Sequence, residues 1–347
     1  MENNYVSLKD LVVKLLNSSD TVFIVGHNNP DFDSLGASVG VSLICEKYNK
    51  KSYIIANGDY QQMDKSTALV LDDIKSRFNV VKADQVENLK GNKNLLIVLD
   101  TNKEHRIEVD SEGFDDVLII DHHLTDDKTI KNSYKYINTS SSSTCEIVEK
   151  LMHDMKVKFN PKRFANYLYA GIKLDTRDFD KATNLTHDAA GRLIKAGADT
   201  TFVSNLFIED FDRDRLVQNL ISETKIFNIF YPIAIACQNS NSNVYYTRKD
   251  LARIADYLLK FYPNASFSIG KLDNENYYIS ARSKGLINIG NIMSRFSDGG
   301  GTLCSGAAKI PSFDLSLEEV EKQLIGYIAS DNKEKDEVVK RLKLWIK

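Results

Sequence analysis

The sequence predicts an α/β protein of two domains, the first built on a mostly parallel sheet and the second a smaller α/β domain. Its 347 residues exceed what one hydrophobic core usually serves, so two domains are expected. In the first part of the chain, short apolar runs alternate with segments of helical periodicity, as in parallel strands connected by helices. We place the first domain at residues 1–204, a linker helix at 205–228 and the second domain at 229–347.

The first domain is expected to start with a helix, because its apolar residues recur at helical spacing. Apolar runs predict the strands, while polar capping residues and Gly197 mark where later helices begin and end. The predicted elements are a helix over 8–16, a strand over 22–26, a helix over 35–44, strands over 95–98 and 117–120, and helices that begin near Cys145, at Phe164 and at Thr186.

A charged helical stretch around residues 210–215 predicts the linker helix. Beyond it, the second domain is expected to contain a strand over 232–237, a helix over 249–261, strands near 267 and over 277–281, and a terminal pair of helices.

Composition excludes several classes of protein. A formal net charge of −3 argues against binding to long nucleic acids, which requires an excess of Lys and Arg. The apolar runs are far shorter than the roughly 20 residues that span a bilayer, so no membrane segment is expected. The four cysteines are widely spaced, which favours reduced thiols over a disulfide framework. The polar N-terminus does not resemble a secretory signal peptide. The chain is therefore expected to be cytoplasmic, either whole or as the cytoplasmic part of a longer membrane protein.

Three predicted strands end in possible metal ligands. The first leads to His27, Asp31 and Asp33, the second to Asp100, and the third to the tripeptide Asp121-His122-His123. Side chains just beyond the carboxyl ends of strands in an open α/β sheet converge on one crevice. The sequence therefore predicts a hydrolytic metal centre of imidazoles and carboxylates.

The spacing is compatible with two ions. Asp31 and Asp33 are two residues apart, so each can face a different ion, and Asp100 can bridge the pair while His122 and Asp175 complete the second site. Each motif also has a simpler interpretation: residues 28–31 as a turn, Asp100 as a helix cap, and the paired histidines as surface or core residues. The joint order of the motifs favours the metal centre.

A glycine-rich segment gives a second signal. Gly299, Gly300 and Gly301 lie in a predicted loop whose N–H groups can form an anion-binding nest. Arg282 leaves a predicted strand and can bind phosphate, and Asn288 at a helix start can contact a base or ribose. A hairpin turn with a surface arginine is the alternative.

Together these motifs resemble the DHH phosphoesterases that carry a C-terminal DHH-associated domain, and within them the cyclic di-AMP phosphodiesterase branch. The resemblance spans nearly the whole chain and includes residues 26–37, 121–123, 142–146, 171–176, 282–283 and 299–301.

The resemblance implies a manganese-dependent phosphodiesterase with a cleft between its domains. Such an enzyme hydrolyses cyclic di-AMP to linear pApA, and further hydrolysis of pApA to AMP is left open. It assigns one Mn²⁺ ion to His27, Asp31 and Asp100, the second to Asp33, Asp100, His122 and Asp175, and phosphate orientation or leaving-group protonation to His123. It assigns substrate binding to Arg282, Ser283, Asn288, Gly299, Gly300, Gly301 and Thr302. The implied partner is a small cyclic or short linear nucleotide, and a homodimer is left open.

Thr302 departs from the family, in which a histidine usually follows the triple glycine. Threonine can hydrogen-bond a phosphate but cannot become cationic near neutral pH, so the preference between cyclic and linear substrates is left open. The alternatives are an oligoribonuclease or 3′,5′-bisphosphate (pAp) nucleotidase of the same family, a family II inorganic pyrophosphatase, and a non-catalytic cyclic-dinucleotide sensor.

Overall fold

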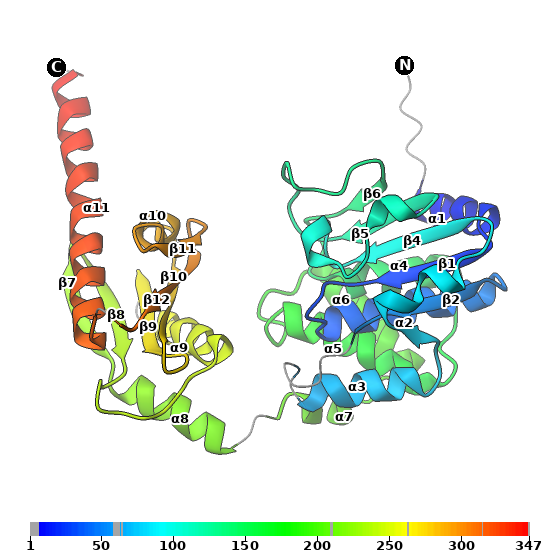
Figure 1. Cartoon of the computed structure of the whole chain (residues 1–347), viewed down its shortest axis with the longest axis horizontal. Helices are drawn as coiled ribbons and strands as arrows, with labels where there is room; N and C mark the ends of the chain where they lie inside the picture. The colour runs from blue at the N-terminus through cyan, green and yellow to red at the C-terminus, as the bar shows by residue number, and fades with distance from the viewer. Residues whose placement is uncertain are drawn as a thin grey trace. The chain divides into compact units, whose positions relative to one another are not determined.

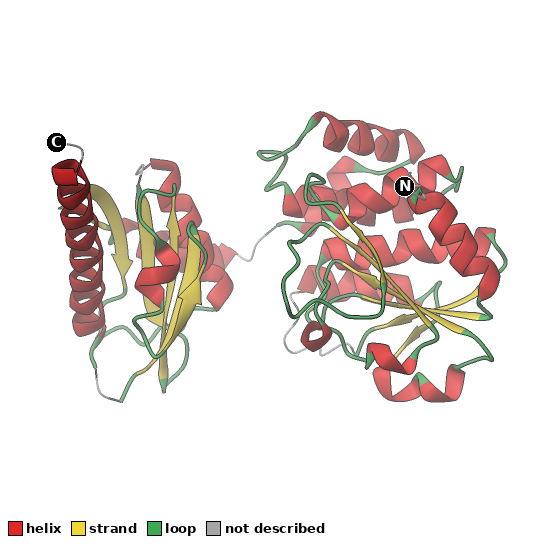
Figure 2. Ribbon diagram, turned by 90° about the horizontal axis from the view of Figure 1, so that it is seen from above, coloured by secondary structure: helices red, strands yellow, loops and turns green. Residues whose placement is uncertain are grey.

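The computed structural model describes residues 7–57, 63, 65–208, 211–261, 264–313 and 315–345. It divides into two compact units, Met1–Ile208 and Glu209–Lys347, and each combines a sheet with helices (Figure 2). The predicted α/β class is confirmed. No helix in the described part of the chain is both long enough and apolar enough to cross a membrane.

The N-terminal unit contains a six-stranded sheet in the order β3-β2-β1-β4-β5-β6, and all neighbouring strands are parallel. Its strands are β1 (Thr21–Val25), β2 (Lys51–Ile55), β3 (Val80–Val81), β4 (Asn94–Leu99), β5 (Asp116–Asp121) and β6 (Tyr134–Ile137). Every residue of β1 and β4 is buried, because central parallel strands are covered on both faces.

The N-terminal helices are α1 (Leu8–Ser18), α2 (Phe32–Lys47), α3 (Lys65–Lys75), α4 (Thr144–Asp154), α5 (Ala165–Asp175), α6 (Asn184–Ala196) and α7 (Thr200–Leu206) (Figure 1). They contribute to the core that includes Val22 and Ile24, whereas the alternate residues Phe23 and Val25 belong to a separate core. Alternation along β1 thus divides its side chains between the two faces of the sheet. On the α1–α7 face, α2 is buried along most of its length.

The C-terminal unit contains a second six-stranded sheet, β11-β12-β10-β9-β8-β7. Its strands are β7 (Lys225–Ile229), β8 (Tyr231–Cys237), β9 (Ala265–Lys271), β10 (Asn276–Ser283), β11 (Asp298–Gly301) and β12 (Ser305–Pro311). Strands β8 and β9 are parallel and the other neighbours are antiparallel. The helices α10 (Ile289–Met293) and α11 (Leu317–Trp345) supply one core, and α8 (Phe211–Ser222) with α9 (Arg248–Phe261) supplies another.

The predicted linker helix over 205–228 is wrong as a single element. This range contains the end of α7, the helix α8 and most of the strand β7. Val217 and Leu220 of α8 pack in a core with Ala234 and Ile254, so α8 is part of the C-terminal unit. The helical periodicity that suggested the linker covers only α8, and the β-branched and aromatic residues after it pair with β8.

The start of α6 and the number of terminal helices also differ from the prediction. Helix α6 is capped by Thr183, and Thr186 completes a capping box three residues later. The predicted terminal pair of helices is the single helix α11.

Candidate metal centre

The predicted ligands meet at the carboxyl ends of the central strands in the N-terminal unit. Strand order reverses between β1 and β4, since β2 and β3 lie beyond β1 while β5 and β6 lie beyond β4. Open α/β sheets bind ligands at such a switch point. His27 follows β1 and Asp100 follows β4, so the topology itself brings these two side chains together.

His27, Asp31 and Asp100 form the first group, with ligand atoms all within 4.8 Å of one another. Nε2 of His27 lies 3.4 Å from Oδ2 of Asp31 and 3.4 Å from Oδ2 of Asp100. Asp31 also caps α2, because its Oδ1 accepts hydrogen bonds from the N–H groups of Asp33 and Ser34. The cap leaves Oδ2 of Asp31 facing the histidine.

Asp33, Asp100, His122 and Asp175 form the second group under the same 4.8 Å limit. Nε2 of His122 lies 3.0 Å from Oδ2 of Asp175 and 3.5 Å from Oδ1 of Asp100. Asp175 is the last residue of α5. Gly171, one turn earlier, allows α5 to approach, because a Cβ there would lie 2.8 Å from Cα of Asp33.

Asp33 is fully buried against the N-terminus of α4. Its carboxylate accepts hydrogen bonds from the N–H groups of Thr144, at 2.7 Å, and Cys145, at 2.8 Å. The positive end of the helix dipole therefore supports this negative charge.

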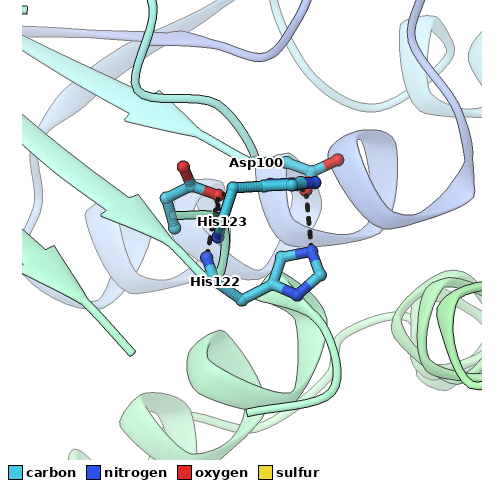
Figure 3. A group of neighbouring side chains, drawn as sticks. Asp100, His122 and His123 are labelled. Atoms are coloured by element: carbon cyan, nitrogen blue, oxygen red, sulfur yellow. Dashed lines mark hydrogen bonds and ion pairs between the residues drawn. The ribbon is translucent and has the colours of Figure 1, made fainter. Parts of the chain in front are cut away.

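Asp100 belongs to both groups and turns a different oxygen to each histidine. Its φ of 60° lies in the left-handed region, which aspartate tolerates better than most side chains. The Oγ1 of Thr144 donates to Oδ1 at 3.3 Å. Figure 3 shows Asp100 with the neighbouring rings of His122 and His123.

The protonation states in this cluster respond to the crowded carboxylates. Burial raises the pKa of Asp33, and the negative charges of Asp100 and Asp175 raise it further. Burial alone would lower the pKa of His27, but Asp100 and Asp31 outweigh it and raise that pKa to about 10. The same balance, with Asp100 and Asp175, raises the pKa of His122 to about 11.

These residues fit a bound metal. Nε2 of His122 is buried and makes no well-directed hydrogen bond within the described residues, although two carboxylates approach it. A divalent cation could replace the protons of both histidines and balance the carboxylates. Imidazole and carboxylate ligands together suit several divalent transition metals.

Asp121 and His123 lie beside these residues and form a further group with Asp100 and His122 under the same 4.8 Å limit. Asp121 is fully buried, and its Oδ1 accepts hydrogen bonds from the N–H groups of His122, at 2.8 Å, and His123, at 3.1 Å. The same oxygen lies 2.8 Å from Nδ1 of His123, and Asn102 donates to Oδ2 at 2.7 Å. His123, whose side chain is 47% exposed, is thus oriented by a buried carboxylate.

Sequence reasoning missed Asn102 and the contact of Thr144 with Asp100. Asn102 lies two residues after Asp100, beyond the same strand, and its position was the available signal. Thr144 was expected within the segment 142–146 that resembles the family, without a contact to Asp100.

The structure places the predicted substrate residues of the C-terminal unit in internal contacts. The Arg282 guanidinium forms an ion pair with Asp256, with Nε at 3.0 Å from Oδ1, and also donates to the carbonyl of Ala281. The Ser283 hydroxyl donates to the carbonyls of Ile287 and Leu303. Asn288 caps α10, as its predicted position at a helix start requires.

The triple glycine is not a nest-forming loop. Gly299, Gly300 and Gly301 lie in strand β11, which pairs with β12 in a hairpin, so the alternative of a hairpin is the better interpretation. The strand requires glycine for close packing, because a Cβ on Gly299 would lie 2.0 Å from the carbonyl oxygen of Met293. Thr302 is exposed beyond the strand, and its hydroxyl donates to the carbonyl of Ser305.

Comparison with known proteins agrees with this architecture. Residues 21–172 match the family described as "DHH family, N-terminal domain". Over 340 residues, the chain is 31% identical to the cyclic-di-AMP phosphodiesterase GdpP of Bacillus subtilis, and the alignment covers 92% of this chain and 49% of that protein. Over 317 residues, it is 27% identical to the bifunctional oligoribonuclease and PAP phosphatase NrnA of Mycoplasma genitalium, covering 85% of this chain and 90% of that protein.

A solved structure shares the fold. The exopolyphosphatase-related protein from Bacteroides fragilis has a TM-score of 0.69 at 20% identity, covering 94% of this chain and 98% of that one.

Fold and site together define an α/β protein with a histidine and aspartate cluster that could bind metal. Residues 21–172 match the DHH family domain, which the motifs in that part of the chain predicted. It spans about half the length of the Bacillus relative.

Proposed function

We propose that this chain is a phosphodiesterase of the cytoplasm that hydrolyses cyclic di-AMP to linear pApA with two Mn²⁺ ions. The observation that carries the proposal is Asp100, whose two oxygens face the histidines of two separate ligand groups. The similarity to a cyclic-di-AMP phosphodiesterase supports the substrate. The four cysteines, which are free thiols, support a reducing compartment.

The two ligand groups would each hold one ion: His27, Asp31 and Asp100 the first, and Asp33, Asp100, His122 and Asp175 the second. Two divalent ions side by side supply an activated water and neutralise charge on the phosphate oxygens. The chain itself contributes position, because Asp31 is fixed by its helix cap and Asp33 by the first turn of α4.

In this proposal His123 acts on the substrate. With Nδ1 held by Asp121, its Nε2 can hydrogen-bond a phosphate oxygen or donate a proton to the leaving 3′ oxygen. We assign nucleotide contacts in the C-terminal unit to Arg282, Ser283, Asn288, the glycines 299–301 and Thr302, of which Thr302 is exposed beyond β11. Arg282 would have to exchange its Asp256 contact for a phosphate.

The test is product analysis of purified protein with Mn²⁺ and four substrates in parallel: cyclic di-AMP, pApA, pAp and pyrophosphate. We expect cyclic di-AMP to have the highest kcat/KM of the four substrates, and pApA to be its first product. Faster turnover of pAp would instead favour the second candidate, an oligoribonuclease and pAp phosphatase. The near-complete coverage of NrnA by this chain supports that candidate. Tight binding of cyclic di-AMP without hydrolysis of any of the four would favour a sensor.

A further inference from the structure

One ring nitrogen of His27 is not used by the ligand cluster. Nε2 faces Asp31 and Asp100, whereas Nδ1 is buried and forms no hydrogen bond with any described residue. A histidine that binds metal through one nitrogen almost always donates its other N–H to a carboxylate, a carbonyl or a water. His27 therefore needs a partner for Nδ1 that the direct contacts do not supply.

A small cavity beside His27 offers room for that partner. Its lining includes His27, Ser34, Ser38, Ile54 and Glu108. The space open to the centres of water molecules is about 10 Å³, which is roughly the room of one water. Because polar groups line part of this cavity, a water there can make the several hydrogen bonds that hold an internal water in place.

Glu108 is the acidic residue among those that line the cavity. Its Oε2 accepts a hydrogen bond from the N–H of Asn57 at 2.8 Å, which fixes the carboxylate beyond the end of β2. The preceding segment is also tied to the β1 exit, because the N–H of Asn28 donates to the carbonyl of Arg106 at 2.7 Å. Glu108 is half-buried, and burial raises the pKa of its carboxyl.

We propose that Glu108 is a positioning residue for His27: a water in the cavity accepts the Nδ1–H of His27 and donates to the Glu108 carboxylate. This arrangement selects the tautomer in which Nε2 carries the lone pair, and it keeps that lone pair aimed at the first ligand group. The inference rests on the proposed metal centre but not on the identity of the substrate.

The experiment measures Mn²⁺ binding to metal-free protein by titration calorimetry, without substrate. Four proteins are compared: wild type, Glu108→Ala, Glu108→Gln and Glu112→Ala. Gln keeps an oxygen that can accept from the water, and Glu112 is an exposed acid on the same segment. Glu108→Ala should weaken binding of one ion about 10-fold or more, with the other two variants within about threefold of wild type.

Unfolding midpoints of the four proteins in EDTA separate positioning from folding. The proposal expects Glu108→Ala to lose Mn²⁺ affinity while its metal-free midpoint stays close to that of Glu108→Gln. A crystal structure should show a water within hydrogen-bond distance of both Nδ1 and the carboxylate. Wild-type affinity in Glu108→Ala, or equal losses in the Ala and Gln variants, would overturn the inference. Because this assay contains no substrate, the Mn²⁺ affinities can be interpreted even if the protein does not hydrolyse cyclic di-AMP.

Discussion

At the scale of single residues, Asp100 is the carboxylate that the two ligand groups share. Replacing it by Asn removes the charge that both histidines face, while the side-chain volume stays the same. We expect Asp100→Asn to lower kcat/KM with Mn²⁺ by about 10³-fold or more, equivalent to ~4 kcal/mol of barrier. Steady-state hydrolysis of cyclic di-AMP measures this. Asp180→Asn, at an exposed position outside both groups, is the control and should keep wild-type activity.

Asn102 is expected to matter through Asp121. Its buried amide donates to Oδ2 of Asp121 at 2.7 Å and to the carbonyl of His123 at 3.4 Å, so it acts on the centre through these two residues. Asn102→Ala leaves a buried carboxylate oxygen without this donor, which should destabilise the protein by about 1–3 kcal/mol. It should also lower kcat more than it changes KM, because His123 loses its fixed orientation. Denaturant unfolding and steady-state kinetics measure the two effects, and unchanged kcat would contradict the role of Asp121 in orienting His123.

His27, Asp100 and His122 could be predicted to lie close together because each follows an apolar strand, whereas Asp175 ends the helix α5. The internal contacts of the proposed substrate residues could not be predicted from the sequence. A sequence shows that Arg282 is cationic, but it does not show that Asp256, 26 positions away, forms an ion pair with it. The same holds for Asn102, whose partner Asp121 is on the neighbouring strand.

At the scale of elements, the buried strands and amphipathic helices were predictable, whereas elements shaped by tertiary pairing were not. Strands β1, β4 and β5 form from continuous apolar runs. Strand β11 consists of Asp298 and three glycines, residues that are depleted in strands. Its pairing with β12 and its contact with α10 determine its conformation.

Two neighbouring glycines of β11 give a matched test of that packing. A Cβ on Gly299 would lie 2.0 Å from the backbone oxygen of Met293, whereas a Cβ on Gly300 would meet nothing within 4 Å. Gly299→Ala should therefore destabilise the C-terminal unit by about 1–3 kcal/mol, and Gly300→Ala should change its stability by less than about 0.5 kcal/mol. Chemical unfolding of both variants in EDTA measures the difference. Equal effects would show that these glycines serve something other than contact with α10.

At the scale of the whole molecule, each unit has its own cores, while the proposed ligands all belong to the N-terminal unit. Metal binding should therefore stabilise one unit and leave the other nearly unchanged. Because a ligand that binds only the native state stabilises it by RT ln(1 + [L]/Kd), Mn²⁺ at 100 times its Kd should add about 2.7 kcal/mol to the N-terminal unit.

Calorimetric scans of wild type and Gly299→Ala, in EDTA and in Mn²⁺, can show whether Mn²⁺ stabilises only the N-terminal unit. We expect two transitions, of which Mn²⁺ raises only the one from the N-terminal unit and Gly299→Ala lowers only the other. Asp100→Asn should remove the Mn²⁺ shift, because both ligand groups lose their shared carboxylate. A Mn²⁺ shift of equal size in both transitions would mean that the two units unfold cooperatively or that the C-terminal unit binds metal as well. Either result would require a different assignment of the stabilising contacts.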